Sequence, residues 1–535
     1  MKQSTVSYKR HDFSGHWDAV IIGSGIGGLA TAAIMAKEGK RVLVLERHYT
    51  AGGFTHVFRR PKYEWDVGLH YVGEVTRPNS TLRRLFDYVT DGKLEWADMG
   101  EVYDQICFGD EVYPFRKGTD NFKAELKRHF EAPEDQQAID DYVDLVFKAV
   151  GQGQKYFMEK AMPPLLGKLT GRFLRSKFLD LAGRSTLSVM RELTSNERLI
   201  GVLTGQWGDY GLPPSKSSFA MHAMVARHYF SGGAYPVGGS GAILEHIAPV
   251  IEQAGGVIAV SAEVDEILIE NDRAVGVRMA DDREIRADMV ISGAGYMNTV
   301  SSLLPEDVAR RHDMLSELQQ VEPSASHICL YLGFQKTAEE LELPKANYWL
   351  YPDNYDHDQN VERFVANPEE TELPVTYISF PSAKDPDWER RYPGTATVEI
   401  ITVAPYDWFR EWEGTRWKKR GEEYDALKAR LSERMLAKLY AVEPQLEGEI
   451  DHCELSTPLS TKHFANYDTG EIYGLAHTPE RFEKRFLRAH TPVRDLYLTG
   501  QDIATCGIGG ALSASMITAA AALKQNIPAK IFKAS

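Results

Sequence analysis

The sequence predicts an α/β fold in which an inserted α+β domain interrupts a domain built on a parallel sheet. Three observations lead to this prediction. A short apolar run, a glycine-rich turn and a helical pattern follow one another over residues 19–37. Strand-like runs return at 257–269, 289–291 and 496–498, and the stretches between them have a different pattern. A length of 535 residues also indicates more than one domain, at roughly 100 to 200 residues each.

The first unit is a strand, turn, helix and strand of the size of one βαβ crossover. Residues 19–22 form an apolar run that enters G-S-G-I-G-G, and residues 29–37 form an alanine-rich helical pattern that ends at Gly39. A second apolar run, 42–45, ends at Glu46. A strand followed by a glycine turn and a helix is typical of a Rossmann-like domain.

Later segments complete this domain. Ile243, Ile247 and Ile251 repeat at helical spacing, with Pro249 as an expected kink. The strand patterns at 257–269 and 289–291 flank a turn at Asn271 and Asp272. At the far end, a strand at 496–498 precedes glycines and a helix at 511–523.

The domain boundaries follow from these patterns. The Rossmann-like domain is predicted to comprise 1–110, 215–300 and 490–535, and the inserted domain 111–214 and 301–489. The pattern is largely helical over 120–230. It mixes strands with a long helix, 422–440, over 320–490.

Charge and cysteine content exclude several classes of protein. The net charge of −15 argues against nucleic acid as a partner, because binding to phosphates depends on positive surface. The four cysteines form no CxxC pair, which predicts neither a disulfide framework nor a thiolate zinc site, and we expect no metal site. The polar N-terminus lacks a signal-peptide core and no run reads as a membrane span, so we expect a cytoplasmic protein.

The glycine turn predicts a dinucleotide site. Gly23, Gly25 and Gly28 satisfy G-x-G-x-x-G, and Gly27 lies in the same turn. The first glycine permits the tight turn, the second lets the backbone approach a pyrophosphate, and the third allows close packing of helix on strand. Glu46 follows Gly28 by eighteen residues, where a carboxylate can accept hydrogen bonds from ribose hydroxyls. The alternative is a glycine-rich turn without a ligand.

FAD and NAD share this fingerprint, and other residues favour FAD. Arg47 and the doublet Gly52-Gly53 resemble the second glycine pair of the flavoprotein superfamily that includes glutathione reductase, amine oxidases and phytoene desaturases. Near the C-terminus, Gly500, Asp502 and Gly509 lie between a strand and a small-residue helix. The resemblance implies that Asp502 binds the flavin ribityl chain and that the helix start faces the flavin ring. The alternative for the Gly52-Gly53 doublet is a mobile turn. The alternative at the C-terminal end is that Asp502 caps a helix and that the glycines allow close packing.

Several further blocks resemble the retinol saturase family, with carotenoid isomerases and desaturases as relatives. They include WDVGLHYVG at 65–73, GLPPSKSSFAMHA at 211–223, HYFSGGAYPVGGS at 228–240 and LYLTGQDIATCG at 496–507. The resemblance implies an FAD enzyme that acts on a conjugated polyene or another unsaturated lipid. It also implies that Val264 presents its backbone to adenine, whereas the alternative is a valine of the core. The apolar N-terminal signal of the animal enzymes is missing, so location in the endoplasmic reticulum is not implied.

Saturation of a carbon–carbon double bond needs a hydride from the flavin and a proton for the neighbouring carbon. The sequence offers His70 and Tyr235 as proton-donor candidates, and such a reaction can also proceed without a protein acid. Aromatic residues between 350 and 490 could line an apolar substrate tunnel or simply fill the core. Three other functions stay open: polyene desaturation or isomerisation, lipid binding with a structural flavin, and amine oxidation.

Two expectations concern partners. No second glycine fingerprint with the required spacing is present, so we expect electrons from diffusible NAD(P)H, a reductase or a quinone. Residues 155–191 hold eight Lys or Arg against Glu159 and Asp180, interleaved with apolar residues. This pattern fits a peripheral contact with an anionic membrane as well as it fits a solvated helix face.

Overall fold

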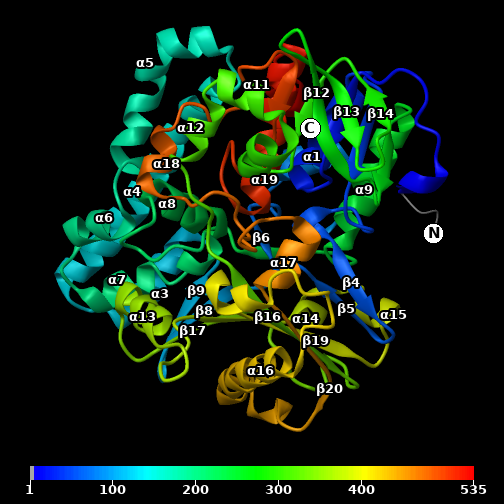
Figure 1. Ribbon diagram of the computed structural model, residues 1–535. Helices are drawn as coiled ribbons and strands as arrows, with labels where there is room; N and C mark the ends of the chain where they lie inside the picture. The colour runs from blue at the N-terminus through cyan, green and yellow to red at the C-terminus, as the bar shows by residue number, and fades with distance from the viewer. Residues whose placement is uncertain (1–4, 535) are drawn as a thin grey trace.

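The computed structural model describes residues 5–534, and its central layer is a six-stranded parallel sheet. The strands follow the order β1 (Val6–Ser7), β11 (Val257–Val260), β3 (Val42–Glu46), β2 (Ala19–Ile22), β15 (Val290–Ser292) and β21 (Leu496–Leu498). Segments from both ends and the middle of the chain thus share one sheet, as Figure 1 shows in the upper right part of the molecule. The predicted α/β class with a Rossmann-like domain is confirmed.

Three helices pack close to this sheet. They are α1 (Ile26–Lys37), α9 (Gly241–Gln253) and α19 (Gly507–Leu523), and α1 contacts both of the others. The predicted helices are confirmed, although α1 begins before the expected 29–37 and α19 before 511–523. Small residues make the close contact of α1 and α19 feasible, because alanine and glycine let two helix backbones approach. Helix α9 continues through Pro249.

The predicted strand pattern at 257–269 is split. Ser261 adopts a φ of 53°, so β11 ends at Val260 and the chain turns out of the sheet. A separate strand, β12 (Val264–Glu270), then pairs with β13 (Arg273–Met279), which pairs with β14 (Glu284–Arg286). The expected turn between them is confirmed, since Asn271 and Asp272 both have positive φ values, 49° and 62°.

The second domain contains a seven-stranded mixed sheet. Its order is β20 (Ile450–Ser456), β16 (His327–Phe334), β19 (Ala396–Val403), β18 (Thr376–Ser379), β17 (Asn347–Tyr351), β8 (Val102–Phe108) and β9 (Glu111–Arg116). Helix α16 (Glu422–Val442) packs on it through Leu431, Met435 and Leu439, which confirms the helix predicted at 422–440. A helical layer stands beside this sheet, built on α4 (Pro133–Glu159), α5 (Pro164–Ala182) and α8 (Phe219–Tyr229).

Two expected domain boundaries differ from the strand and helix packing. Strand β8 falls inside the predicted segment 1–110, yet it pairs with β17 of the seven-stranded sheet. Helix α8 falls inside the predicted segment 215–300, yet it packs against α4. The local sequence of each element does not indicate which domain it packs against, because both are amphipathic or apolar. Tertiary contacts therefore determine the domain to which each belongs.

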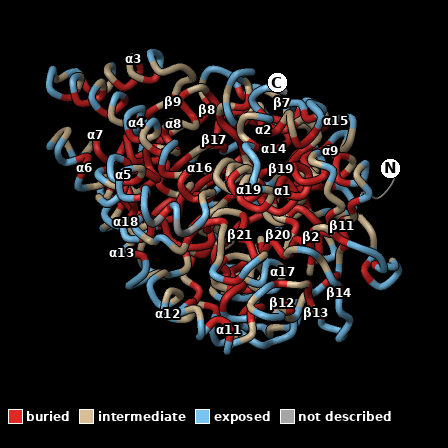
Figure 2. Tube along the Cα trace, turned by 90° about the horizontal axis from the view of Figure 1, so that it is seen from above, coloured by how far each residue is buried: buried red, intermediate tan, exposed pale blue. Residues whose placement is uncertain are grey.

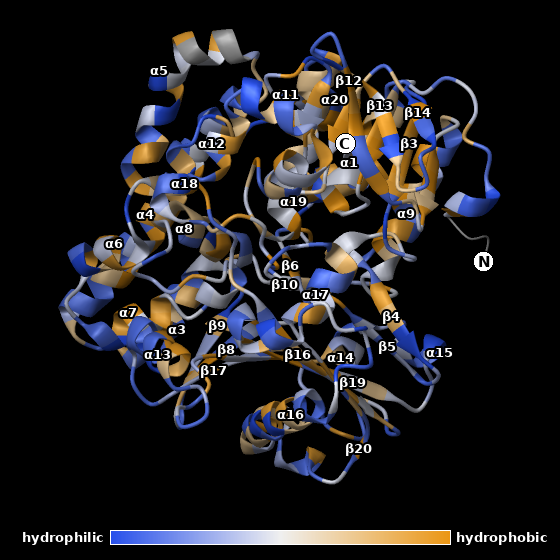
Figure 3. Cartoon of the chain, in the orientation of Figure 1, coloured by the Kyte–Doolittle hydropathy of each residue, from blue (hydrophilic) through white to orange (hydrophobic). Residues whose placement is uncertain are grey.

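The buried residues form separate cores for these layers. One core surrounds the six-stranded sheet, a second lies among the helices, and a third lies between α16 and the seven-stranded sheet. Figure 2 shows buried chain around α1, α19 and β2 and exposed chain along the rim. Figure 3 shows the same distribution as hydrophobic colour on the strands near β3 and β13. The layers meet along a cavity that residues of both domains line.

Candidate active site

A cavity of about 1550 Å³ joins the glycine turn, the start of α19 and the seven-stranded sheet. Ligand cavities for one small molecule occupy about 300–1,000 Å³, so this volume can hold a dinucleotide together with a second molecule. Residues from both ends of the chain line it, including Gly25 of the N-terminal turn and Gly509 of α19. The segments at 53–56, 262–264 and 500–511 also contribute to the wall.

The N-terminal glycines shape one end of the cavity. Strand β2 ends at Ile22 and the chain turns through Gly23, whose φ of 89° favours glycine. A Cβ on Gly28 would lie 2.3 Å from the carbonyl oxygen of Gly23, and a Cβ on Gly27 would lie 2.7 Å from the Cα of Gly500. Gly25 differs, because it lines the cavity and no atom lies within 4 Å of its added Cβ. A side chain at Gly25 would fill space that glycine leaves to a ligand at the start of α1.

The second glycine pair packs against the first turn. Gly52 has a φ of 124° and forms an isolated bridge with Gly25. A Cβ on Gly53 would lie 2.7 Å from the Cα of Gly25, so only glycine allows this approach. The doublet is therefore part of the wall around the phosphate end of the predicted cofactor site.

Glu46, Arg47 and Val264 all line the cavity near the end of β3. The Glu46 carboxylate accepts hydrogen bonds from Ser24 N at 2.9 Å and Ser24 Oγ at 2.6 Å through Oε2, and from His48 N at 2.7 Å through Oε1. Each carboxylate oxygen can accept two hydrogen bonds, so Oε1 retains capacity for a ribose hydroxyl. Arg47 pairs with Glu263 at 3.0 Å and contributes to the rim rather than to the phosphate end.

The C-terminal end places the predicted ribityl residue differently from the sequence expectation. Gly500 lines the cavity with open space beside its Cα, and Gly509 lies in the first turn of α19. Asp502 does not line the cavity: its carboxylate accepts hydrogen bonds from Tyr296 N at 2.7 Å and Leu475 N at 3.0 Å. Gln501 lines the cavity instead. Asp502 thus fastens two loops that support the site, and the expected direct contact with the ribityl chain stays a prediction.

Another part of the cavity wall is aromatic. The predicted region 350–490 supplies Tyr377, Tyr467 and Tyr473, whereas Tyr71 and Tyr229 come from outside it. The rings of Tyr71 and Tyr229 stack with centroids 4.2 Å apart. Flat apolar faces of this kind can pack against an elongated unsaturated molecule.

His70 lines the cavity, and its Nδ1 lies 2.8 Å from Oε2 of Glu399. Burial lowers the pKa of His70 to about 4, and the positive charge of Lys384 acts in the same direction. Burial also raises the pKa of Glu399 to about 8. At neutral pH the imidazole is therefore neutral, which makes His70 a poor proton donor.

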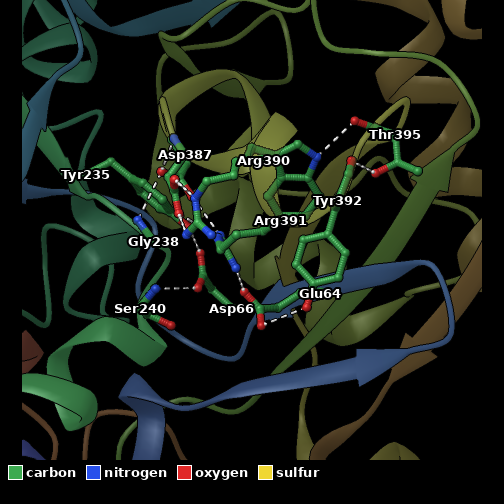
Figure 4. A network of polar contacts seen from close by, with 12 residues as sticks. Glu64, Asp66, Tyr235, Gly238, Ser240, Asp387, Arg390, Arg391, Tyr392 and Thr395 are labelled. Carbon is green, nitrogen blue, oxygen red and sulfur yellow. Dashed lines mark hydrogen bonds and ion pairs between the residues drawn. The ribbon is translucent and has the colours of Figure 1, made fainter. Parts of the chain in front are cut away.

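Tyr235 does not line the cavity. Its hydroxyl donates to Asp66, which also accepts from Ser240 N at 3.1 Å. Figure 4 shows these groups within a network that includes Glu64 and Arg391. Arg391 pairs with Glu64 and with Asp385, so the network ties residues 381–395 to the hairpin of β4 (Val57–Arg60) and β5 (Tyr63–Asp66). Tyr235 belongs to this scaffold, and the structure does not place it as a catalyst.

Residues that sequence reasoning missed include Ser24, Gln501 and Asp209, which all contribute to the site. Ser24 and Gln501 lie next to glycines of the two fingerprints, so their position in the sequence could have indicated them. Asp209 lies in WGDYG at 207–211, where an acid among aromatic residues and glycines was the only signal.

None of the helices in the described part of the chain combines the length and the apolar character that a membrane span requires.

Comparison with known proteins agrees with this geometry. The model of the family of flavin containing amine oxidoreductases matches residues 26–523. An all-trans-retinol 13,14-reductase of Danio rerio is 37% identical over 96% of this chain and 87% of its own length. A chloroplastic prolycopene isomerase of an Oncidium hybrid cultivar is 25% identical over 96% of this chain and 85% of its own length. A crystal structure of putrescine oxidase superposes with a TM-score of 0.63 at 16% identity, covering 96% of this chain and 100% of that one.

Proposed function

The chain belongs to the family of flavin containing amine oxidoreductases, and on this premise we propose that it saturates one double bond of a polyene lipid. It is an FAD-dependent oxidoreductase, as the family match and the relatives at 37% identity indicate. The proposed substrate is a retinoid- or carotenoid-like polyene or another unsaturated lipid. The bound flavin supplies the hydride equivalent, and the protein supplies orientation, exclusion of water and a proton.

One observation carries the proposal: the same cavity that receives the glycine turn continues into a wall of stacked aromatic rings. Tyr71 and Tyr229 form that wall together with Trp349 and Tyr377. An uncharged polyene offers no group for an ion pair, so its recognition depends on apolar area and shape.

Anaerobic mixing tests the proposal. Enzyme whose flavin has been chemically reduced is mixed with retinol, a carotene or an unsaturated fatty acid, and flavin and polyene absorbance are followed together. Saturation predicts reoxidation of the flavin with a blue shift or loss of the polyene band, and a product two mass units heavier. A Glu46→Ala variant that binds less flavin serves as the matched control, because its polyene turnover should fall with its flavin content.

The second candidate is isomerisation or desaturation of a polyene, which the similarity to a prolycopene isomerase favours. Isomerisation predicts a spectral shift of the polyene without net reoxidation of the flavin and without a change in mass. Desaturation predicts a product two mass units lighter and requires oxidised rather than reduced flavin at the start. Enzyme that leaves every polyene tested unchanged in both redox states contradicts both candidates.

We further propose that diffusible NAD(P)H delivers the electrons. The two other glycine-rich stretches have backbone N–H groups that carboxylates already occupy: Gly238 N donates to Asp385 at 3.0 Å, and Tyr296 N donates to Asp502. Neither stretch therefore offers free N–H groups at these positions for a second dinucleotide. Anaerobic bleaching of the flavin by NADPH or NADH tests the donor. An unbleached flavin that a reductase or a hydroquinone reduces would exclude it.

The lipid reaches the site, we propose, from an anionic membrane surface that contacts α5. This helix stands at the upper left edge of the molecule in Figure 1. Leu169 and Phe173 are 76% and 80% exposed, and Leu166 lies on the same stripe. The opposite face packs into the helical core through Phe178 and Leu181, and buried Arg175 donates to the Phe482 carbonyl at 2.6 Å. Because the core takes this other face, the exposed apolar stripe is left without a partner among the described residues and suits an interface with lipid.

The surroundings of α5 add two supports. Lys155, Arg172 and Lys177 are exposed beside the stripe, whereas Lys160 and Arg175 of the same stretch are buried. The side chains at 164, 165 and 168 lie outside the described part. Met158 of α4, which packs against α5, is exposed and also lines the cavity, so the cavity reaches the surface next to the stripe.

Vesicle sedimentation tests the contact. A Leu169→Ser, Phe173→Ser double variant should bind phosphatidylserine vesicles about tenfold or more weakly, since each buried apolar side chain is worth about 1.5–3 kcal/mol. Its stability and flavin content should not change, because both residues are exposed. Val365→Ser, at an exposed apolar residue of α13 (His357–Ala366), is the matched control and should bind like the parent protein. Equal binding by all three proteins, or no binding by the parent, would refute the contact.

A further inference from the structure

Asp209 lies in the cavity wall with its hydrogen-bonding capacity largely unused. It ends a short helical turn, Trp207–Asp209, and it lines the cavity beside Tyr71. The described residues give its carboxyl group one hydrogen-bond contact, between Oδ2 and the Tyr71 hydroxyl at 3.4 Å. Other buried carboxyl groups, such as Asp104 and Asp66, each accept two or three hydrogen bonds. Asp209 is therefore placed for a ligand or a reaction rather than for the scaffold.

The contact with Tyr71 indicates which group carries the proton. The Tyr71 hydroxyl has one proton, and its shorter bond, 2.8 Å, goes to Oδ2 of Asp104. Burial raises the pKa of Asp104, but the hydrogen bonds that it accepts from Tyr71, from Gln206 at 2.7 Å and from Asn347 at 2.9 Å favour its ionised form. With the Tyr71 proton committed to Asp104, Asp209 can contact the Tyr71 oxygen favourably only as an O–H donor. Desolvation and the neighbouring Asp104 charge agree with this, since both raise the pKa of Asp209 well above its usual range.

The position of Asp209 matches the flavin end of the cavity. The Cys506 thiol donates to the carbonyl oxygen of Asp209 over 3.7 Å. Cys506 is the residue before α19, whose first turn lines the cavity with Gly507 and Gly509. The stacked rings of Tyr71 and Tyr229 lie on the same side, because Tyr71 contacts Asp209 directly. An acid, an aromatic platform and the helix start thus surround one part of the cavity.

We propose that Asp209 is the catalytic acid of the double-bond reduction. This inference rests on the proposed function. The O–H bond of the Asp209 carboxyl group breaks, its proton and the π electron pair form a new C–H bond at one carbon of the double bond, and Asp209 is left as a carboxylate. A reduced flavin held by the glycine turns would supply the hydride, with its electron pair, for the neighbouring carbon. Water that enters the cavity after product release returns the proton.

Asp209→Asn is the decisive variant, because it keeps the size and polarity of the side chain and removes the acidic proton. Its flavin content and its reduction by dithionite should equal those of the parent enzyme. Flavin reoxidation by the polyene should slow by about 100-fold or more, the usual contribution of a general acid. Asp209→Glu should recover part of the rate. Asp135→Asn changes a buried carboxyl group that lies outside the cavity, and it should retain the parent rate.

A second measurement does not depend on turnover. The infrared difference spectrum of parent enzyme minus Asp209→Asn at neutral pH should contain the C=O stretch of a protonated carboxyl group. An Asp209→Asn enzyme that is reoxidised at the parent rate, or a difference spectrum that lacks this band, overturns the assignment. Failure of the parent enzyme to be reoxidised by any polyene is a different outcome: it refutes the proposed function and the acid role with it, even if the band is present.

Discussion

The carboxyl groups around Arg391 and those in the cavity wall differ in how many hydrogen bonds and ion pairs their oxygen atoms form. Around Arg391, the carboxylates of Glu64 and Asp385 form ion pairs, and Asp66 accepts from Tyr235 and Ser240 (Figure 4). In the cavity wall, the carboxyl group of Asp209 has one hydrogen-bond contact with the described residues, to Tyr71. The first group joins segments more than 100 residues apart in the chain, whereas the second faces the space in which a ligand would lie.

The comparison teaches that a shifted pKa does not by itself mark a catalytic residue. Burial raises the pKa of Asp66 to about 7 and also raises that of Asp209. Both carboxyl groups are desolvated, yet only Asp209 lines the cavity. Free hydrogen-bonding capacity and access to the cavity distinguish the two roles. We therefore expect changes in the Arg391 network to lower stability and changes around Asp209 to lower the rate.

The largest effect on stability is expected for Arg391→Ala. The variant leaves the buried carboxylates of Glu64 and Asp385 without their cation, which should lower the free energy of unfolding by about 3–5 kcal/mol. Urea unfolding measures the loss. Flavin reoxidation by the substrate, per folded molecule, should stay at the parent rate, because Arg391 does not line the cavity.

Arg390→Ala is the matched control for this prediction. Arg390 is the preceding residue and pairs with Asp387 at the surface, where its side chain is 75% exposed. Surface pairs of this kind contribute about 0–1 kcal/mol. If both variants lost the same stability, the Arg391 network would not be the scaffold described above.

Much of the Rossmann-like domain could be predicted from the sequence, because its signals are local. The apolar run before Gly23 and the alanine-rich helix after it determine β2 and α1. The scaffold and catalytic roles could not be separated in the same way. Tyr235 and Asp209 both lie in stretches of sequence rich in glycine and aromatic residues, and only the tertiary contacts show which one faces the cavity.

The C-terminal fingerprint shows a similar limit. Its strand and helix were predicted, but the acid was expected in the ligand wall, whereas Gln501 lines the cavity and Asp502 accepts two backbone N–H groups. Adjacent residues at a strand end point in different directions, so a shift of one position along the chain decides whether a side chain faces the ligand or supports the loops. The sequence pattern predicts the strand and the helix, whereas the direction of each side chain is known only from the structure.

A smaller effect is expected from pH acting on a scaffold histidine. His222 contacts the hydroxyls of Tyr142 at 2.8 Å and Tyr210 at 3.2 Å, and burial lowers its pKa to about 3. The unfolded chain binds a proton at His222 below about pH 6.5, whereas the folded protein does not until about pH 3, so acidification favours unfolding. His222 should thus cost about 2 kcal/mol of stability between pH 7 and pH 5.

Urea unfolding at the two pH values measures this cost when parent protein and His222→Gln are compared. The variant lacks the titrating group, so its stability should fall by about 2 kcal/mol less than that of the parent over the same interval. Equal losses in the two proteins would show that His222 takes up its proton with the same affinity in the folded and unfolded states.

The smallest expected loss of stability comes from Tyr235→Phe, and its partner variant, Tyr71→Phe, makes the comparison sharp. Each change removes a tyrosine hydroxyl that donates a hydrogen bond to a buried carboxyl group, Asp66 or Asp104. Each should lower the free energy of unfolding by about 1–2 kcal/mol. Their effects on rate should differ. Tyr235→Phe should leave the rate of flavin reoxidation by the substrate unchanged at every pH. Tyr71→Phe removes the oxygen that contacts Asp209, so it should shift the pH at which the rate of flavin reoxidation falls on the alkaline side. If both variants, or neither, showed this shift in pH dependence, then lining the cavity would not distinguish a catalytic residue from a structural one.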